Sequence, residues 1–215
     1  LVDGLAESRH VFIQGNNLIA RWQKLSKKQS FCIMETGFGT GLNFLATWQL
    51  WNNLNLGKTN KLHFISVEKY PMDSEQLEKS LIHWEHSLSD LAKQLLEKYP
   101  PLLKGSHQLV FDNDNVILTL LFIDISEIMP CLDNNPVAPV DAWYLDGFAP
   151  SKNPAMWHND LYLQMYRLSR DDATVATYTV AGSVRRGLSA AGFSIGRKPG
   201  FGTKREMLTA NKLTE

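Results

Sequence analysis

A glycine-rich turn between an apolar stretch and a helical pattern constrains the fold of this chain more than any other feature. The turn spans residues 35–41 and reads Glu-Thr-Gly-Phe-Gly-Thr-Gly. It follows the apolar residues 31–34 and precedes apolar residues at helical spacing from Leu42 to Trp51. Glycines let the backbone turn sharply and approach a ligand closely. Strand, glycine turn and helix are together typical of nucleotide-like cofactor sites in α/β proteins, so the sequence predicts such a site.

Glu35 narrows the choice of cofactor. A carboxylate beside the turn would repel the pyrophosphate of a dinucleotide, and the spacing G-x-G-x-G departs from the dinucleotide pattern G-x-G-x-x-G. S-adenosylmethionine has no phosphate but carries a sulfonium and an α-ammonium group, which suit an anion. A glycine-rich run alone is more often an ordinary loop, whereas the strand, helix and carboxylate around this one favour a cofactor site. The residues expected to bind the cofactor here are Glu35, Gly37, Phe38, Gly39, Gly41 and Asn43.

Length and composition predict one α/β domain in a reducing compartment. At 215 residues the chain is long enough for one domain with a sizeable core and short for two. Its longest apolar stretches are too short to span a bilayer, so no membrane association is expected. The only cysteines are Cys32 and Cys131, and a buried reduced thiol is the simplest interpretation of the first. We therefore expect a cytoplasmic protein.

The order of apolar segments predicts a Rossmann-like α/β fold, with a mostly parallel central sheet, an antiparallel last strand and helices on both faces. The first 20 residues resist assignment, although 11–13 fit an edge strand and 18–22 a short helix; residues 1–29 are expected to pack on the domain as an extension. Asp73 and Gln76 predict a capped helix start, with further helices at 88–98, 155–168 and 183–190. The predicted strands are 31–35, 62–67, 108–111, 116–123, 140–145, 173–179, 193–198 and 206–210.

Four of these strands end at an acidic residue. In an open parallel sheet, ligands bind beyond the carboxyl ends of the strands. Any one such acid is as readily explained as a cap for the next helix, but four in register favour a shared site. We expect Glu68 to accept both ribose hydroxyls, Asp124 to accept the adenine amino group, and Asp146 to lie beside the reacting methyl group. The four acids are Glu35, Glu68, Asp124 and Asp146.

The segment Asp-Gly-Phe-Ala-Pro at 146–150 suits methylation of an amine. An alkylamine is mostly protonated at pH 7, so its methylation needs an acceptor that orients the N–H groups and takes or relays a proton. An aromatic side chain would shield the transfer or stack on a cation or base. Asp146 and Phe148 supply both and are the predicted catalytic residues. A tight turn is the alternative interpretation, and no spacing of His, Cys and acids indicates a metal site.

Basic residues gather near the end of the chain although the formal net charge is zero. Two arginines at a helix start oppose the helix dipole, which favours acids there, so they suggest an anionic partner. RNA phosphates are the natural candidate for this partner. The alternative is that these basic residues form an ordinary solvent-exposed surface with no partner. The residues expected to contact RNA are Lys152, Arg185, Arg186, Lys198, Lys204 and Arg205.

Several longer segments resemble one protein family. They are METGFGTGLNFL (34–45), VEKYP (67–71), VDAWYLDGFAPSKNPAMW (140–157), VRRGLSAAGF (184–193) and GFGTKREML (200–208). These segments are similar to the methyltransferase part of the bacterial tRNA 5-methylaminomethyl-2-thiouridine biosynthesis proteins, the MnmC type. The resemblance covers nearly the whole chain.

The resemblance implies a substrate and a partner. Such an enzyme transfers a methyl group from S-adenosylmethionine to the 5-aminomethyl group of wobble uridine 34 in tRNA, giving 5-methylaminomethyl-2-thiouridine. The residue 35–41 turn, Glu68 and Asp124 would hold the cofactor, and Asp146 would face the amine. Ile123 stands where the family usually has glycine, which leaves the contact of Asp124 open. The family commonly carries a flavin-dependent oxidase part as well. Residues 1–215 contain no second glycine-rich fingerprint of the kind that a flavin domain would need, so we expect either a stand-alone methyltransferase or a fragment of a fused protein. The start at Leu1, without an initiator Met, favours an incomplete N-terminus.

Two other functions remain open from the residues alone. The glycine turn by itself fits a nicotinamide-dependent oxidoreductase, although its spacing and Glu35 count against that function. A non-catalytic RNA-binding module with the same fold is the second alternative, and the carboxylates at the strand ends argue against it.

Overall fold

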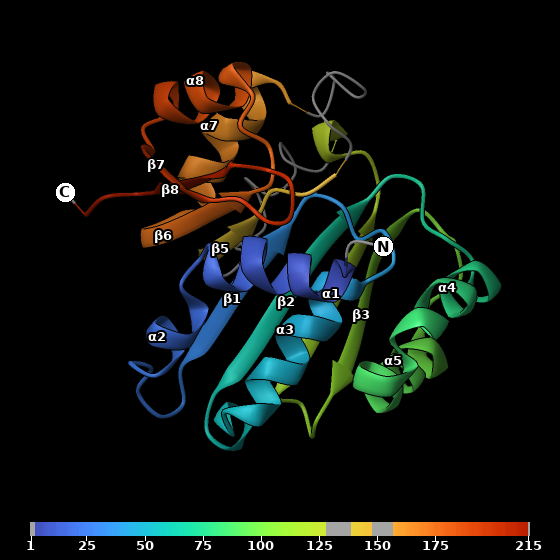
Figure 1. Ribbon diagram of the computed structural model, residues 1–215. Helices are drawn as coiled ribbons and strands as arrows, with labels where there is room; N and C mark the ends of the chain where they lie inside the picture. Colours follow the sequence, from blue (N-terminus) through green and yellow to red (C-terminus); the bar gives the residue numbers. More distant parts are fainter. Residues whose placement is uncertain (1–2, 128–138, 148–156, 215) are drawn as a thin grey trace.

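The computed structural model describes residues 3–127, 139–147 and 157–214, and within them one twisted sheet organises the chain (Figure 1). The strand order is β3-β4-β2-β1-β5-β6-β8-β7. The inner strands from β4 to β6 run parallel, whereas β3 at one edge and β8 and β7 at the other are antiparallel to their neighbours. The strands are β1 (Ser30–Glu35), β2 (Lys61–Glu68), β3 (Gly105–Phe111), β4 (Val116–Phe122), β5 (Val140–Tyr144), β6 (Ser169–Thr177), β7 (Ser194–Pro199) and β8 (Glu206–Asn211).

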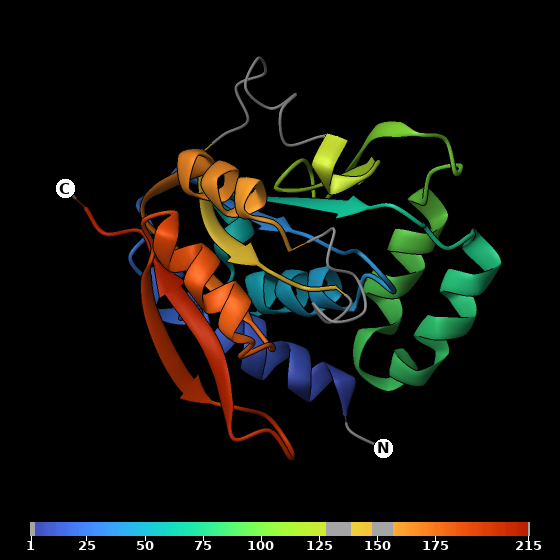
Figure 2. The ribbon, with the colours of Figure 1, turned by 90° about the horizontal axis from the view of Figure 1, so that it is seen from above.

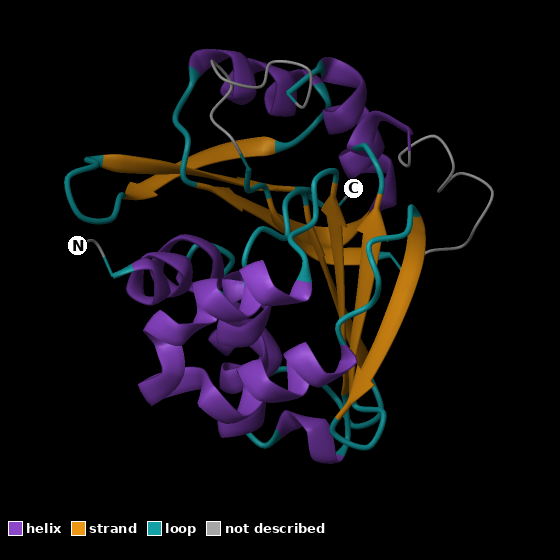
Figure 3. Ribbon diagram, turned by 90° about the vertical axis from the view of Figure 1, so that its right-hand side faces the viewer, coloured by secondary structure: helices purple, strands orange, loops and turns teal. Residues whose placement is uncertain are grey.

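Helices cover both faces of this sheet (Figure 3). The cluster of buried side chains on one face includes those of α3 and α5, and the cluster on the other face includes those of α7 and α8. The described helices are α1 (Gly4–Ser8), η1 (Arg9–Gln14), α2 (Leu18–Trp22), α3 (Leu42–Asn53), η2 (Leu56–Lys58), α4 (Ser74–Leu81), η3 (Ile82–Trp84), α5 (Glu85–Lys98), α7 (Asn159–Leu168) and α8 (Gly182–Ala190). The predicted fold class is therefore confirmed. Across the described segments, every helix is too short or too polar to cross a bilayer.

Strand β1 shows why the apolar run at 31–34 folds this way. Phe31 and Ile33 belong to the core on one face, and Cys32 and Met34 to the core on the other. Side chains alternate between faces along a strand, so a strand buried on both sides must be apolar throughout. β1 lies between β2 and β5 in the centre of the sheet. The chain leaves β1 toward β2 on one side and returns to β5 on the other, so the carboxyl ends of β1 and β5 form the switch point where α/β proteins bind ligands.

The N-terminal segment differs from its predicted structure. Residues 11–13 were expected to fit an edge strand, but they lie in η1, a π-helix. The three consecutive side chains Val11, Phe12 and Ile13 are all buried, because η1 packs between α3 and β6; a strand at a sheet edge would bury only alternate side chains. The short helix at 18–22 is confirmed as α2. Figure 2 shows these N-terminal helices between α3 and the β7–β8 pair.

Other predicted elements are confirmed with small shifts. Asp73 and Gln76 form the predicted capping box at the start of α4. The predicted turn at 112–115 joins β3 and β4 as an antiparallel pair, and Asp112, Asn113 and Asp114 all have positive φ, a conformation that Asn and Asp tolerate. The helix predicted from 155 to 168 begins at Asn159, after the N-cap residue His158, and ends at Leu168 as predicted; residues 155 and 156 lie outside the described part.

Candidate active site

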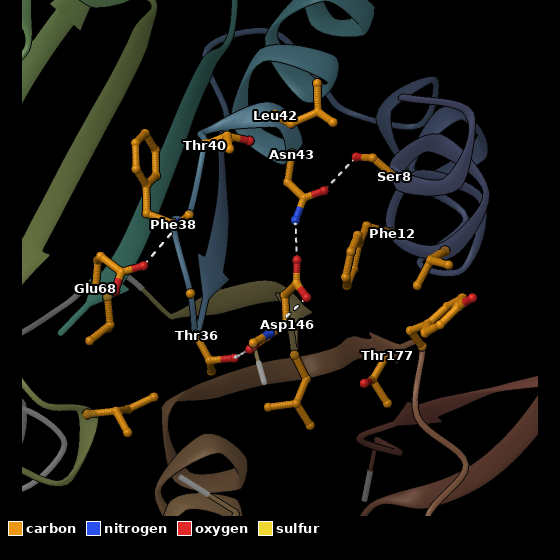
Figure 4. A pocket seen from close by; sticks show the side chains of 18 of the residues that line it. Ser8, Phe12, Thr36, Phe38, Thr40, Leu42, Asn43, Glu68, Asp146 and Thr177 are labelled. Carbon is orange, nitrogen blue, oxygen red and sulfur yellow. Dashed lines mark hydrogen bonds between the residues drawn. The ribbon is translucent and has the colours of Figure 1, made fainter. Parts of the chain in front are cut away.

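A cavity of about 910 Å³ opens at the carboxyl ends of the central strands (Figure 4). This volume falls in the range of small-molecule and cofactor sites. Three of the four predicted acids, Glu68, Asp124 and Asp146, line the cavity. They come from the ends of three different parallel strands, which the sheet brings to one edge.

The glycine turn forms one wall. Gly37, Phe38 and Gly39 line the cavity, and Gly41 ends the turn immediately before α3. Gly39 has a φ of 51°, and a Cβ there would meet no protein atom within 4 Å, so the backbone is open to a ligand at this point. Gly41 has a φ of 72°, and a Cβ there would lie 2.7 Å from the Phe38 ring. Gly41 is thus not among the lining residues but is required for the shape of the turn.

Glu68 is held against this turn by backbone groups. Its Oε2 accepts a hydrogen bond from the Gly39 N–H at 3.0 Å, and its Oε1 accepts one from the Tyr70 N–H at 2.8 Å. A carboxylate has about four acceptor positions, so both oxygens of Glu68 can accept further hydrogen bonds. The arrangement fits the predicted interaction with a pair of hydroxyl groups.

Asp124 lies in a different electrostatic environment. Its Oδ2 is 2.7 Å from Lys69 Nζ, and its Oδ1 accepts hydrogen bonds from the backbone N–H and the hydroxyl of Ser126 at 2.9 and 2.7 Å. The hydrogen bond from Lys69 is the main reason that the pKa of Asp124 is lowered to about 2. Asp124 therefore reaches the cavity as one half of an ion pair.

Asp146 is fixed at the switch point. Its Oδ2 accepts a hydrogen bond from Asn43 Nδ2 at 2.8 Å, and its Oδ1 accepts one from the Gly147 N–H at 2.7 Å. The Thr36 hydroxyl donates to the Asp146 carbonyl oxygen at 2.5 Å, which joins the glycine turn to this segment. Burial raises the pKa of the Asp146 carboxyl above its usual value, and this makes the carboxylate a stronger proton acceptor.

Glu35 does not line the cavity but is fully buried behind Asn43. Its Oε1 accepts a hydrogen bond from Asn43 Nδ2 at 2.8 Å, and its Oε2 accepts one from the Ser66 hydroxyl at 2.6 Å. Burial, followed by the nearby charge of Asp146, raises the pKa of Glu35 well above its usual value. The predicted direct contact of Glu35 with a cation is therefore replaced in this geometry by a contact with Asn43, which does line the cavity.

The N-terminal helices and the end of β6 provide the opposite wall of the cavity, which was not predicted from the sequence. This wall contains residues from α1 and η1 that no local motif marks, and it is completed only by tertiary packing. Ser8 in this wall donates a hydrogen bond to Asn43 Oδ1 at 2.6 Å (Figure 4). The lining residues of the wall are Gly4, Glu7, Ser8, Val11, Phe12, Thr177, Tyr178 and Thr179.

Of the predicted RNA-contact residues, some are exposed, one lines the cavity and one binds backbone groups within the protein. Arg185 and Arg186 are exposed near the start of α8, close after the cavity-lining residue Thr179. Lys204 lines the cavity, with its Nζ 3.5 Å from the centre of the Tyr178 ring.

Of the remaining predicted basic residues, Arg205 is exposed, whereas Lys198 binds backbone carbonyl groups within the protein. Lys198 Nζ donates to the carbonyl oxygens of Gln14 and Gly15 at 3.2 and 2.9 Å, at the end of η1. The predicted residues Phe148 and Lys152 lie outside the described residues.

The cavity fits S-adenosylmethionine rather than a phosphate-bearing cofactor. Four carboxylates line it, while its two lysines are engaged by Asp124 and by the Tyr178 ring. Such a surface attracts a cation and repels a phosphate. Together with a Rossmann-like sheet and an open glycine turn, it defines the class of S-adenosylmethionine-dependent methyltransferases.

Comparison with known proteins shows the family directly. A family model described as S-adenosyl-L-methionine-dependent methyltransferase matches residues 86–213, and the chain belongs to this family. The chain is also 45% identical over 214 residues to the tRNA 5-methylaminomethyl-2-thiouridine biosynthesis bifunctional protein MnmC of Vibrio campbellii, covering 98% of this chain and 32% of that protein. It is 48% identical over 206 residues to the protein of the same name in Ectopseudomonas mendocina, covering 96% of this chain and 30% of that protein. The resemblance expected from the sequence segments is thereby confirmed, and the chain spans about a third of the length of these relatives.

A solved structure supports the fold. The crystal structure of MNMC2 from Aquifex aeolicus matches with a TM-score of 0.72 at 22% identity, over 95% of this chain and 59% of that one. At this identity the likeness concerns the fold alone.

Proposed function

We propose that this chain methylates the exocyclic nitrogen of 5-aminomethyl-2-thiouridine at wobble position 34 of tRNA, giving 5-methylaminomethyl-2-thiouridine. The observation that carries the proposal is the position of Asp146, a partly buried carboxylate fixed between the glycine turn and the cavity of an S-adenosylmethionine-dependent methyltransferase. The names of the relatives, at 45–48% identity over nearly the whole chain, support the choice of tRNA as substrate.

The cofactor would lie along the glycine turn. Gly37, Phe38 and Gly39 would contact it, Glu68 would accept its ribose hydroxyls, and Asp124 would approach the adenine. When bound, S-adenosylmethionine supplies an electrophilic methyl group on a positively charged sulfur. Asn43 would border this site, while Gly41 and Glu35 would act by shaping the turn and holding Asn43.

Asp146 would serve the substrate amine. The nitrogen must offer its lone pair, so it has to lose a proton before or during the transfer. A carboxylate at Asp146 can accept a hydrogen bond from the amine, orient the lone pair and take the released proton. Burial raises the pKa of Asp146, which brings its basicity closer to that task. Phe148, two residues further along the chain, is proposed as the aromatic wall of this site.

The tRNA would approach over the rim that carries the basic residues. Arg185, Arg186 and Arg205 are exposed, and no ion pair engages them within the described part of the chain. They are therefore available for phosphates. Lys204 at the cavity mouth, and Lys152, are further proposed contacts. Lys198 would act indirectly, because its ammonium group holds the end of η1.

The wider setting follows from the same relatives. Their names describe bifunctional proteins, and the chain corresponds to about a third of each. A flavin-dependent oxidase, linked or separate, is the partner we propose, since an oxidase that exposes the aminomethyl group would supply the substrate. A tRNA substrate implies work in the cytoplasm. Membership of the methyltransferase family removes the motivation for an oxidoreductase.

A methylation assay tests the proposal. Purified protein would be mixed with S-adenosylmethionine and tRNA that carries 5-aminomethyl-2-thiouridine, and nucleosides would be measured by mass spectrometry. The proposal predicts conversion to the methylated nucleoside and none with tRNA whose wobble uridine lacks the aminomethyl group. Binding of tRNA without any methyl transfer would instead support a non-catalytic RNA-binding module.

A further inference from the structure

The side-chain amide of Asn43 uses all of its main hydrogen-bonding positions within the protein. Its Nδ2 donates to Glu35 Oε1 and to Asp146 Oδ2, each at 2.8 Å, and its Oδ1 accepts from the Ser8 hydroxyl at 2.6 Å. An amide nitrogen has two hydrogens, so both are committed to carboxylates. Asn43 is therefore anchored from three sides and has one orientation that satisfies every partner.

The backbone of Asn43 is fixed as well. Its carbonyl oxygen accepts a hydrogen bond from the Thr47 hydroxyl at 2.6 Å, and this hydroxyl is 2.9 Å from the phenol oxygen of Tyr144. Tyr144 is the last residue of β5, two positions before Asp146. The start of α3 and the end of β5 are thus connected twice, once through Thr47 and once through Asn43, and a rigid support of this kind keeps a functional group in place.

Ser8 brings the N-terminal helix into this arrangement. It is buried, and it lies in the cavity wall beside Glu7. Without its hydroxyl, Asn43 Oδ1 would lose its hydrogen-bond donor in a buried site, and the amide could rotate away from Asp146. Figure 4 shows Asn43 between Ser8 on the N-terminal helix and Asp146 on the opposite side.

Glu35 supplies the third anchor of the Asn43 amide, by accepting a hydrogen bond from Nδ2. Two ionised carboxylates sharing one amide would repel each other, and burial disfavours the charged form of the enclosed one. Burial, followed by the charge of Asp146, raises the pKa of Glu35 well above its usual value, so the charged form of Glu35 is disfavoured. Glu35 and Asn43 therefore form a buried support behind the carboxylate of Asp146.

We propose that Asn43 is a positioning residue for methyl transfer, that Ser8 locks it, and that the N-terminal helix α1 is thereby part of the catalytic apparatus. Asn43 holds the Asp146 carboxylate so that its remaining acceptor positions face the cavity and the substrate amine. This inference rests on the proposed function.

The test compares Asn43→Ala and Ser8→Ala with wild type in the tRNA methylation assay across a range of pH. Loss of a hydrogen bond to a charged group commonly costs about 10- to 100-fold in rate when that group acts in the reaction. We expect Asn43→Ala to lower kcat by about that factor and Ser8→Ala to lower it less. The hydrogen bond from Asn43 lowers the pKa of Asp146, so its loss should move the acidic limb of the kcat profile to higher pH. The affinity for S-adenosylmethionine, measured by calorimetry, should change much less than kcat.

Three further variants separate positioning from general damage. Asn52→Ala removes another amide-to-carboxylate hydrogen bond from the same helix, that of Asn52 Nδ2 to Asp112 at 2.9 Å, and should leave kcat and its pH profile unchanged. Glu35→Gln should retain more activity than Glu35→Ala, because glutamine still offers an acceptor to Asn43. If Asn43→Ala fails to fold, Ser8→Ala carries the test.

An unmoved acidic limb in the folded variants, or a loss confined to cofactor affinity, would overturn the inference. Failure of the proposed function has a different signature, because wild type itself would then leave aminomethyl tRNA unmethylated.

Discussion

The two ends of the cavity hold carboxylates in opposite environments. At the inner end, Asp146 is partly buried in the cavity wall, Glu35 is fully buried behind it, and burial raises the pKa of both. At the outer end, Asp124 pairs with Lys69, and its pKa is lowered to about 2. Environment assigns different chemistry to identical groups. We therefore expect the inner end to handle protons and the substrate amine, and the outer end to bind the cofactor as a permanent anion.

The largest expected effect is on the inner end. Asp146→Asn keeps the shape of the side chain but removes the proton acceptor, so methyl transfer should fall by about 10²- to 10⁴-fold, the usual contribution of a general base. Single-turnover assays with aminomethyl tRNA would measure the loss. Cofactor affinity should stay within a few-fold of wild type. Asp160→Asn changes an exposed carboxylate on α7 and serves as the control. Full activity in Asp146→Asn would remove this residue from the mechanism.

The outer end should respond in affinity instead. Glu68→Ala removes the carboxylate proposed to accept the ribose hydroxyls, and hydrogen bonds to a charged group contribute roughly 1.5–3 kcal/mol each. Calorimetric titration should show S-adenosylmethionine binding weakened by about 10- to 100-fold. At saturating cofactor, kcat should recover most of its value. Glu75→Ala on the exposed face of α4 is the matched control. If Glu68→Ala and Asp146→Asn lowered the rate of methyl transfer equally and also lowered the affinity for S-adenosylmethionine equally, the two ends would not differ in function.

The basic rim outside the cavity should affect only the tRNA. Reversing both charges with Arg185→Glu and Arg186→Glu should weaken tRNA binding on the order of 10-fold or more near physiological salt, with a shallower salt dependence. Cofactor binding should not change. Filter-binding titrations at several salt concentrations measure both quantities. Lys93→Glu, an exposed charge reversal on α5, is the control, and unchanged tRNA binding in the double variant would place the RNA surface elsewhere.

The smallest expected effect is the change of the free energy of unfolding with pH, and the carboxylates at the two ends contribute to it with opposite signs. Because the pKa of Glu35 is raised in the folded protein, the free energy of unfolding should fall as pH rises above about 4.5, by at most about 1.4 kcal/mol per pH unit. Because the pKa of Asp124 is depressed, its contribution is present above pH 3.8 and is lost as pH falls through about 2.

Urea unfolding between pH 4.5 and 8 measures the first of these effects. Glu35→Gln should flatten part of the pH slope, because burial also raises the pKa of Asp146 and of Asp141, which contribute to the rest. Asp124→Asn, the comparison variant, should keep the wild-type slope over this range. Identical slopes for Glu35→Gln and wild type would contradict a raised pKa of Glu35 in the folded protein.

Local sequence patterns were sufficient to predict the sheet and the acidic residues at the carboxyl ends of its strands. The short apolar run of β1, followed by a glycine turn, is typical of a strand buried on both faces. The parallel order of β1, β2 and β5 brings Glu68 and Asp146 to one edge of the sheet. The capping box at Asp73 and the turn at Asp112 were equally local.

What could not be predicted depends on packing between distant segments. The hydrogen bond between Ser8 and Asn43 joins residues 35 positions apart, and the structure of η1 is set by its burial between α3 and β6. Lys198 looked like one more basic residue, but folding places its ammonium group on the carbonyl oxygens at the end of η1. Glu35 had the correct charge for a cation site, yet β1 carries it behind Asn43 and out of contact with the cavity. Residue type suggested a role in each case, whereas the contacts of the side chain depend on tertiary structure.

A crystal structure of the protein with S-adenosylhomocysteine and tRNA carrying 5-aminomethyl-2-thiouridine tests the division between the two ends most directly. We expect the amine nitrogen to lie within hydrogen-bonding distance of Asp146 and the ribose hydroxyls of S-adenosylhomocysteine to contact Glu68. An amine bound at the outer end beside Asp124, or a ribose without contact to Glu68, would contradict this expectation.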